Sequence, residues 1–158
     1  MRGTKSYKKH LVKPDPKYND LTVSKFINYL MQRGKKTVAQ KIVYDALDII
    51  KQKGKSNPVN IFKQAIEIIS PSVEVKSRRI GGANYQIPIK VDERRQLNLA
   101  CRWIIQAARN KKGKSMSQKL SEELLLAIDH QGAAFKKKED VMRMAQANQA
   151  FAYFARFI

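Results

Sequence analysis

The sequence predicts a mainly helical fold: one domain, built as a six-helix bundle with one protruding β-hairpin arm and a basic N-terminal tail. Apolar residues recur at spacings of three and four through most of the chain, which is the helical pattern. One stretch instead alternates apolar and polar residues around a Gly-Gly pair, as a hairpin does. A length of 158 residues with 43% hydrophobic residues suits a single domain with a modest core.

The first segment of the chain lacks apolar periodicity. Residues 1–19 carry six Lys and Arg side chains against one acid, Asp15. Such a segment cannot bury enough apolar surface to fold alone. We therefore predict an extended basic tail over residues 1–19, followed by a helical domain over residues 20–158.

Three helices are predicted before the hairpin. The apolar face of the first helix is formed by Val23, Phe26, Ile27, Leu30 and Met31, with Gly34 as the stop. The second helix spans about residues 37–52, and its inward residues are Val38, Ile42, Val43, Ala46, Ile49 and Ile50. The third begins with Asn57 as N-cap and Pro58 at the first helical position, and its inward residues are Val59, Phe62, Ile66 and Ile69.

A β-hairpin arm is predicted at about residues 73–91. Its root carries apolar residues at alternating positions, Val73 and Val75 on one strand and Ile87, Ile89 and Val91 on the other. Gly81 and Gly82 permit a tight turn, and Pro88 marks an edge because it cannot donate to a strand ladder. Cations and amides replace apolar residues toward the turn. We therefore expect an arm that is anchored at its root and mobile at its tip.

Three further helices are predicted after the arm. Asp92 caps the fourth, whose buried stripe is Leu97, Ala100, Cys101, Ile104, Ile105 and Ala108. Ser115 and Gln118 have capping-box spacing at the start of the fifth, which runs through Leu120, Leu124, Leu125 and Ile128. Gly132 closes the fifth helix, and the sixth runs from about Ala133 to about Ala150.

The charge is the most informative property of the composition. Thirty-two Lys and Arg face thirteen Asp and Glu, for a net charge of +19. This excess favours a polyanionic partner, and nucleic acid is favoured over an anionic membrane surface. The cations cluster in loops and at helix ends, at residues 33–36, 51–55, 76–79, 94–95, 109–114 and 136–138. Together these clusters predict a surface that contacts a phosphate backbone at many points.

Other functional classes have little support in the sequence. His10, His130 and Cys101 lack metal-ligand spacing, and Cys101 falls on an apolar stripe as a buried thiol would. Adjacent Glu122 and Glu123 fit a solvated helix face better than acid–base catalysis. We therefore predict no catalytic, metal or cofactor site. No apolar run approaches a membrane span or a secretory signal, and one cysteine fits a reducing compartment.

RNA is favoured over DNA because a helical body with a tail and an arm suits irregular folded RNA. Four blocks then strengthen this reading. "DLTVSKFINYLMQRGKKTVAQKIVYDA" (20–46) resembles the signature segment of small-subunit ribosomal protein seven in its bacterial form. The hairpin "VEVKSRRIGGANYQIPI" resembles the arm of that family. "RWIIQAARNKKGKSM" (102–116) and "KKKEDVMRMAQANQAFA" (136–152) are similar to two further family blocks, in the family's order.

The resemblance implies a structural, non-enzymatic RNA-binding protein of the small ribosomal subunit, in the cytoplasm, with an organelle ribosome as the alternative. Members bind the 3′ major domain of the small-subunit ribosomal RNA and help to nucleate assembly of the subunit head. The arm is expected near the exit-site transfer RNA and the messenger RNA exit path. Small-subunit proteins nine, eleven, thirteen and nineteen are expected as neighbours.

The cation clusters and the resemblance together give a set of expected RNA-binding residues. They are Lys8, Lys9, Lys35, Lys36, Lys76, Arg78, Arg79, Arg94, Arg95, Arg102, Arg109, Lys111, Lys112, Lys114, Met116, Lys119, Lys136, Lys137, Lys138 and Arg143.

Two segments depart from the family pattern. The N-terminus opens "MRGTKSYKKH", where bacterial members often open with a small residue and several arginines. At the other end "FAYFARFI" has Tyr153, Ala155 and Arg156 where His, Arg and Trp are common.

Two alternative functions stay open: translational repression through the protein's own messenger RNA, and an architectural DNA-binding module.

Overall fold

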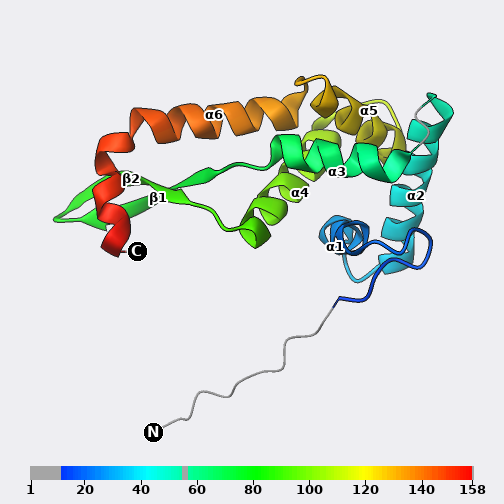
Figure 1. The fold of residues 1–158 in the computed structure, drawn as a ribbon, viewed down its shortest axis with the longest axis horizontal. Coiled ribbons are helices and arrows are strands. Elements are labelled where there is room, and N and C mark those ends of the chain that lie inside the picture. Colours follow the sequence, from blue (N-terminus) through cyan, green and yellow to red (C-terminus); the bar gives the residue numbers. More distant parts are fainter. Residues whose placement is uncertain (1–11, 55–56, 158) are drawn as a thin grey trace, which may run out of the picture.

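A computed structural model describes residues 12–54 and 57–157 and confirms the mainly helical fold with one hairpin arm (Figure 1). The arm lies at one end of the long axis, and α1 and α2 lie at the other (Figure 1). The elements are α1 (Leu21–Leu30), α2 (Lys36–Gln52), α3 (Pro58–Ile69), β1 (Val73–Ile80), β2 (Ala83–Lys90), α4 (Glu93–Asn110), α5 (Met116–Ile128), α6 (Ala133–Ala147) and a 3₁₀ helix, η1 (Gln149–Phe157).

The core joins α1 to α5, with the start of α6 at its edge. Phe26 and Phe62 meet edge to face with their ring centroids 5.1 Å apart. Cys101 and Ile104 are fully buried, as the apolar stripe on α4 predicted. The prediction for Val38 was wrong, because 53% of this residue is exposed. It lies in the first turn of α2, which extends past the core.

Local side-chain caps set the starts of four helices, which is why these boundaries were predictable. Asn57 accepts from Asn60 N and Asp92 from Arg95 N. Ser115 and Gln118 form the reciprocal capping box. Asp20 accepts from Thr22 N and Val23 N and also pairs with Lys63. Burial alone would raise the pKa of Asp20, but Lys63 and the two backbone N–H groups lower it.

The segment before α1 contacts the helical body. Asp15 is 2% exposed and accepts from the backbone N–H of Lys17 and Tyr18 and from the Tyr44 hydroxyl, at 2.7 Å. Lys17 pairs with Asp48 on α2 at 3.0 Å. Burial and the Asp15 carboxylate raise the pKa of Tyr44 to about 12. Residues 12–19 are thus packed against α2, whereas residues 1–11 lie outside the described residues.

The two strands of the arm pair antiparallel, from Val73 opposite Lys90 to Ile80 opposite Ala83. Gly81 and Gly82 form the turn with φ values of +55° and +90°, which only glycine adopts readily at two successive positions. Ile87 is fully buried at the root, as expected.

The arm has a second support, which the sequence analysis missed. The Tyr85 ring on β2 lies 5.2 Å from the Phe151 ring and 5.6 Å from the Phe154 ring, both on η1. Figure 1 shows η1 lying across the arm beyond the end of α6. Tyr85 is only three residues from Gly82, so the arm is held near its tip as well as at its root. The anchor at the root is confirmed, the second anchor was not predicted, and mobility of the tip itself stays a prediction.

Candidate nucleic-acid interface

The predicted RNA-binding residues fall into three regions of the described structure. The first region joins the loop before α2 to the end of α4 and the start of α5, the second is the arm with the start of α4, and the third is α6. Lys8 and Lys9 lie outside the described residues. The three regions spread over the length of the molecule, which is the arrangement expected for contacts with a large folded RNA.

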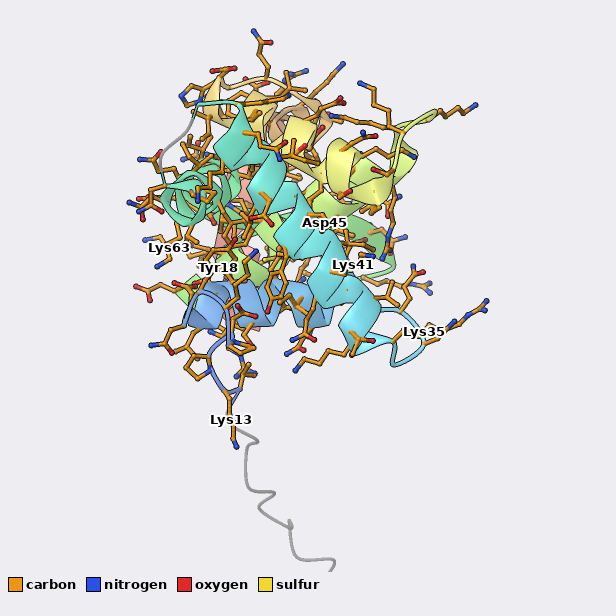
Figure 2. The ribbon with its side chains drawn as sticks, turned by 90° about the vertical axis from the view of Figure 1, so that its right-hand side faces the viewer. Lys13, Tyr18, Lys35, Lys41, Asp45 and Lys63 are labelled. Carbon is orange, nitrogen blue, oxygen red and sulfur yellow. The ribbon has the colours of Figure 1, made fainter. Side chains whose placement is uncertain are left out.

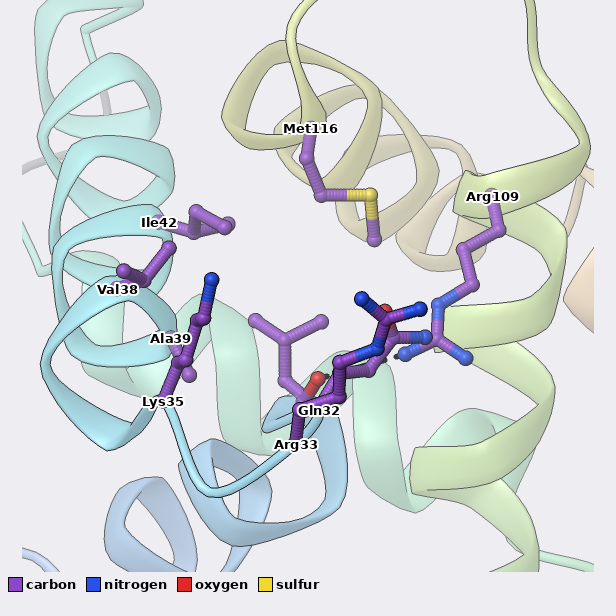
Figure 3. Close-up of a pocket in the computed structure, with 9 residues that line it drawn as sticks. Gln32, Arg33, Lys35, Val38, Ala39, Ile42, Arg109 and Met116 are labelled. Carbon is purple, nitrogen blue, oxygen red and sulfur yellow. Dashed lines mark hydrogen bonds between the residues drawn. The ribbon is translucent and has the colours of Figure 1, made fainter.

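A pocket of about 480 Å³, named here the basic pocket, lies in the first region (Figure 3). It brings together Lys35, Arg109 and Met116, three predicted residues from three parts of the chain. Its complete lining is Leu30, Gln32, Arg33, Lys35, Val38, Ala39, Ile42, Arg109 and Met116. Arg33 belongs to a predicted cation cluster but was not named as a binding residue, and Gln32, Val38 and Ile42 were not predicted in the site.

The loop before α2 shapes one wall of the basic pocket. α1 ends at Leu30, earlier than Gly34, and the chain then turns through left-handed conformations at Arg33 (φ +52°) and Gly34 (φ +73°). Lys35 N donates to Gln32 O at 3.0 Å and closes the turn. In Figure 2, Tyr18 and Lys35 lie on opposite sides of the α2 ribbon, so the packed segment 12–19 and the basic pocket use different sides of this helix.

Arg109 closes the other side of the basic pocket. Its Nη2 donates to the Leu30 carbonyl at 3.3 Å, which ties the end of α4 to the end of α1 (Figure 3). Arg102, two turns earlier, shares a second hollow with Arg109 along α4. Arg102 and Arg109 therefore lie on the same face of α4.

Arg95 behaves differently from Arg102. Its Nε and Nη2 both donate to Glu74 Oε2, at 3.1 and 3.0 Å, and so join the start of α4 to β1. Lys76 contacts the other oxygen of Glu74 at 3.3 Å. These two predicted RNA ligands therefore also hold the root of the arm.

Glu123 was predicted on a solvated face, and this was wrong because its side chain is fully buried. Glu123 Oε2 lies 2.8 Å from Lys111 Nζ, and Glu123 Oε1 accepts from Ala134 N at 2.9 Å. A Cβ on Gly132 would come within 2.8 Å of Glu123 Oε1, so glycine is needed there. Lys111, a predicted RNA ligand, is thus the partner of a buried carboxylate.

Some of the other predicted cations form ion pairs or hydrogen bonds within the protein, and others do not. Lys114 pairs with Glu122 and is the main cause of the lowered pKa of that carboxyl group. Lys138 donates to the Ile68 carbonyl, and Arg143 lies 3.6 Å from Asp140. Within residues 12–54 and 57–157, nine predicted cations have no side-chain hydrogen bond or ion pair: Lys35, Lys36, Arg79, Arg94, Arg102, Lys112, Lys119, Lys136 and Lys137. These side chains can reach phosphates without breaking an internal contact.

Metal binding and membrane insertion each require a distinct structural feature among the described residues. Those residues contain no group of His, Cys, Asp and Glu that could hold a metal ion. None of the helices in the described ranges is long and apolar enough to cross a membrane. Burial raises the pKa of the Cys101 thiol to about 12, which leaves it protonated and unreactive at neutral pH.

Comparisons with known proteins give one consistent result. The sequence matches the family described as Ribosomal protein S7p/S5e over residues 1–149. It is 55% identical to small ribosomal subunit protein uS7 of Thermotoga neapolitana, over 90% of this chain and 92% of that protein. It is 51% identical to the protein of the same name from Petrotoga mobilis, over 98% of this chain and 99% of that protein. With the Marinobacter nauticus relative it shares 53% identity, over 89% of this chain and 90% of that protein.

Proposed function

Because the chain belongs to the Ribosomal protein S7p/S5e family, we propose that it binds the 3′ major domain of the small-subunit ribosomal RNA through its three basic regions. It is a structural, non-enzymatic protein of the small ribosomal subunit, as its relatives of bacterial type are. The proposal concerns which RNA domain is bound and which residues bind it.

The observation that carries this proposal is the set of nine cations that have no side-chain partner among the described residues, in a chain with a net charge of +19. The helices, the arm and a closed core fix the backbone at these residues, so only the side chains need to be ordered when RNA binds. Lysine supplies point charges to phosphates, and arginine can in addition form paired hydrogen bonds or stack on a base.

The arm supports a more specific role. It projects from the end of the molecule opposite α2 (Figure 1), with Arg78 and Arg79 beside its tip. We propose that the body nucleates folding of the subunit head while the arm borders the exit-site transfer RNA and the messenger RNA exit path. Small-subunit proteins nine, eleven, thirteen and nineteen are the proposed neighbours. This division rests on the family resemblance together with the placement of the arm.

Salt dependence tests the phosphate mechanism. If about six to ten phosphates are neutralised, affinity for a 3′ major domain RNA fragment should fall by about 10³- to 10⁵-fold between 50 and 200 mM salt. Filter binding across a salt series gives the slope directly. A nearly flat plot of log affinity against log salt would contradict the proposal. The affinity for duplex DNA, measured at the same salt, tests the alternative of an architectural DNA-binding module. The affinity for the protein's own messenger RNA tests the alternative of a repressor.

Two arginines on α4 provide a matched pair of variants. Arg102→Ala should weaken RNA binding and leave the melting temperature unchanged, because the described residues offer Arg102 no side-chain partner. Arg95→Ala should lower stability by up to about 1 kcal/mol, since its pair with Glu74 is 42% exposed on the arginine side and surface pairs contribute little. Thermal melts beside binding curves check both. Unfolding of the Arg102 variant would show that this arginine is structural.

A further inference from the structure

We infer that Asp15 and Tyr44 form a clasp that positions the basic N-terminal segment for RNA, by fixing the point at which this segment leaves the helical body. The inference rests on the proposed function and deepens it, because it gives a positioning role to two residues that are not themselves RNA ligands. The clasp is defined here as Asp15, Lys17, Tyr18, Tyr44 and Asp48.

The hydrogen bonds of Asp15 are the first observation. Its Oδ2 accepts from the backbone N–H groups of Lys17 and Tyr18, at 3.0 and 3.1 Å. Its Oδ1 accepts from the Tyr44 hydroxyl on α2, at 2.7 Å. Within residues 12–54 and 57–157 this carboxylate, which is 2% exposed, has no cationic partner. A buried carboxylate is costly unless hydrogen bonds replace its lost water, so the acid and its three donors hold one another in place.

The outer layer of the clasp is the second observation. Lys17 Nζ lies 3.0 Å from Asp48 Oδ2, and it lies 5.2 and 5.1 Å from the ring centroids of Tyr18 and Tyr44. The two rings meet edge to face with their centroids 5.9 Å apart. The side chains of Lys17 and Asp48 are 42% and 49% exposed, so this layer lies at the surface. The clasp therefore attaches the segment to α2 from the edge of the core.

The stiffness of the chain before Asp15 is the third observation. Pro14 and Pro16 flank Asp15, and each proline fixes its own φ and favours extended backbone in the residue before it. Val12 and Lys13 line a crevice with residues of α1 and α2. Figure 2 shows Lys13 at the point where the described chain begins. The direction that the clasp sets at Asp15 is therefore carried back to the start of the described chain.

The distribution of charge indicates what the clasp positions. Residues 1–13 contain no acid and five cations: Arg2, Lys5, Lys8, Lys9 and Lys13. Asp15 is the single acid within residues 1–19, and its carboxylate is used inside the clasp instead of neutralising these cations. A cationic segment that is tethered at a fixed point has a higher effective concentration at its phosphates than one tethered eight residues later. Without the clasp, residues 12–19 would also have to be ordered when RNA binds.

Two matched acids test the clasp in the full chain. Asp15→Ala removes the acceptor of three hydrogen bonds. Asp45→Ala removes an exposed acid of α2 that has no side-chain hydrogen bond or ion pair among the described residues (Figure 2). Each change raises the net charge by one, so electrostatics alone predicts equal or slightly tighter RNA binding for both variants.

The clasp predicts that the two variants differ. Asp15→Ala should bind a 3′ major domain RNA fragment about 5- to 50-fold more weakly than the unmodified chain, whereas Asp45→Ala should stay within about twofold. The slope of log affinity against log salt should also become shallower for Asp15→Ala, by about 0.9 for each phosphate contact that is lost. Tyr44→Phe keeps the ring, removes one clasp hydrogen bond and should weaken binding by about 2- to 10-fold. It replaces Asp15→Ala if thermal melts show that variant to be unfolded.

A second background separates positioning from a general effect on the body. Alanine in place of Arg2, Lys5, Lys8 and Lys9 removes the cations that the clasp positions, and here Asp15→Ala or Tyr44→Phe should change affinity by less than about twofold. An equal loss in both backgrounds would overturn the inference, as would equal affinities of Asp15→Ala and Asp45→Ala. Absence of salt-dependent RNA binding by the unmodified chain would instead overturn the proposed function itself.

Discussion

The Glu123 carboxylate holds two separate parts of the chain at once. One oxygen meets Lys111 at the end of α4, and the other accepts from Ala134 N at the start of α6. Because Glu123 is fully buried, loss of its cationic partner would leave an uncompensated charge in the core. The main role of Lys111 is therefore to neutralise Glu123, although the sequence predicted Lys111 as an RNA-binding residue.

Lys111→Met should lower the free energy of unfolding by about 3–5 kcal/mol, the usual cost of breaking a buried ion pair from one side. Lys112→Met is the matched control, since Lys112 is exposed and has no ion pair among the described residues. It should change stability by less than about 0.5 kcal/mol and weaken RNA binding instead. Urea unfolding and RNA titration of both variants separate the two roles. Equal behaviour of the two lysines would contradict the assignment.

The buried thiol predicts a specific alkaline response. The pKa of Cys101 is about 12 in the folded chain against an ordinary value of 9.0, because burial disfavours the thiolate. Above pH 9 the unfolded chain loses this proton and the folded chain keeps it, so unfolding is favoured. The stability difference between the unmodified chain and Cys101→Ala should narrow by about 1.4 kcal/mol between pH 8 and pH 10. Urea unfolding at the two pH values measures it, and a constant difference would mean that the thiol titrates normally.

Single residues were predictable where the local pattern determines burial. Cys101 falls in the middle of a long apolar stripe, so its burial followed from the stripe alone. Val38 continues a similar stripe but lies in the first turn of α2, and the sequence does not show where the core ends. Glu123 is buried only because α6 returns across α5, which is a long-range contact that adjacent acids in a sequence cannot reveal.

At the scale of elements, the brace between η1 and the arm makes a local prediction. Phe151→Ala should loosen residues 77–86, because Tyr85 loses one of its two aromatic partners on η1. Amide hydrogen exchange should speed up in the outer half of the arm and stay unchanged in α1 to α5. Met144→Ala, an exposed change on α6, serves as the control. Equal exchange in the arm of both variants would show that η1 does not restrain it.

Element starts were predictable because caps are local, as at Asn57 with Pro58 and at Ser115 with Gln118. The basic pocket was predictable only in part. Lys35, Arg109 and Met116 were named as separate ligands, but no local pattern indicates that they surround one cavity. The cavity forms only when α1 packs against α4, and the hydrogen bond from Arg109 to the Leu30 carbonyl joins these two helices.

At the scale of the whole molecule, the charge acts in opposite directions on the free chain and on its complex. A net charge of +19 opposes compaction, and salt screens this repulsion. The melting temperature of the free chain should therefore rise as salt increases from about 20 to 200 mM, while RNA affinity falls. Calorimetry of the free chain tests the rise in melting temperature, and RNA titration in the same buffers tests the fall in affinity. A falling melting temperature would mean that attractive pairs, such as Lys63 with Asp20, outweigh the repulsion.

The fold class itself followed from periodicity and charge, which are properties of the whole chain. The order and type of the six helices and two strands were confirmed, whereas the 3₁₀ helix η1 was not predicted. Their arrangement, with the arm and the basic pocket at opposite ends, depends on contacts between distant segments and had to come from the structure.

The contact between Tyr85 and η1 also affects the order in which parts of the nascent chain can fold. A chain is made from its N-terminus, so the arm leaves the translating ribosome well before Phe151 and Phe154 exist to support it. Until η1 is synthesised, the outer part of the nascent arm is a two-stranded hairpin without this support, and such a hairpin is marginal in water. The arm therefore acquires its brace after the segments that form α1 to α5 have been made.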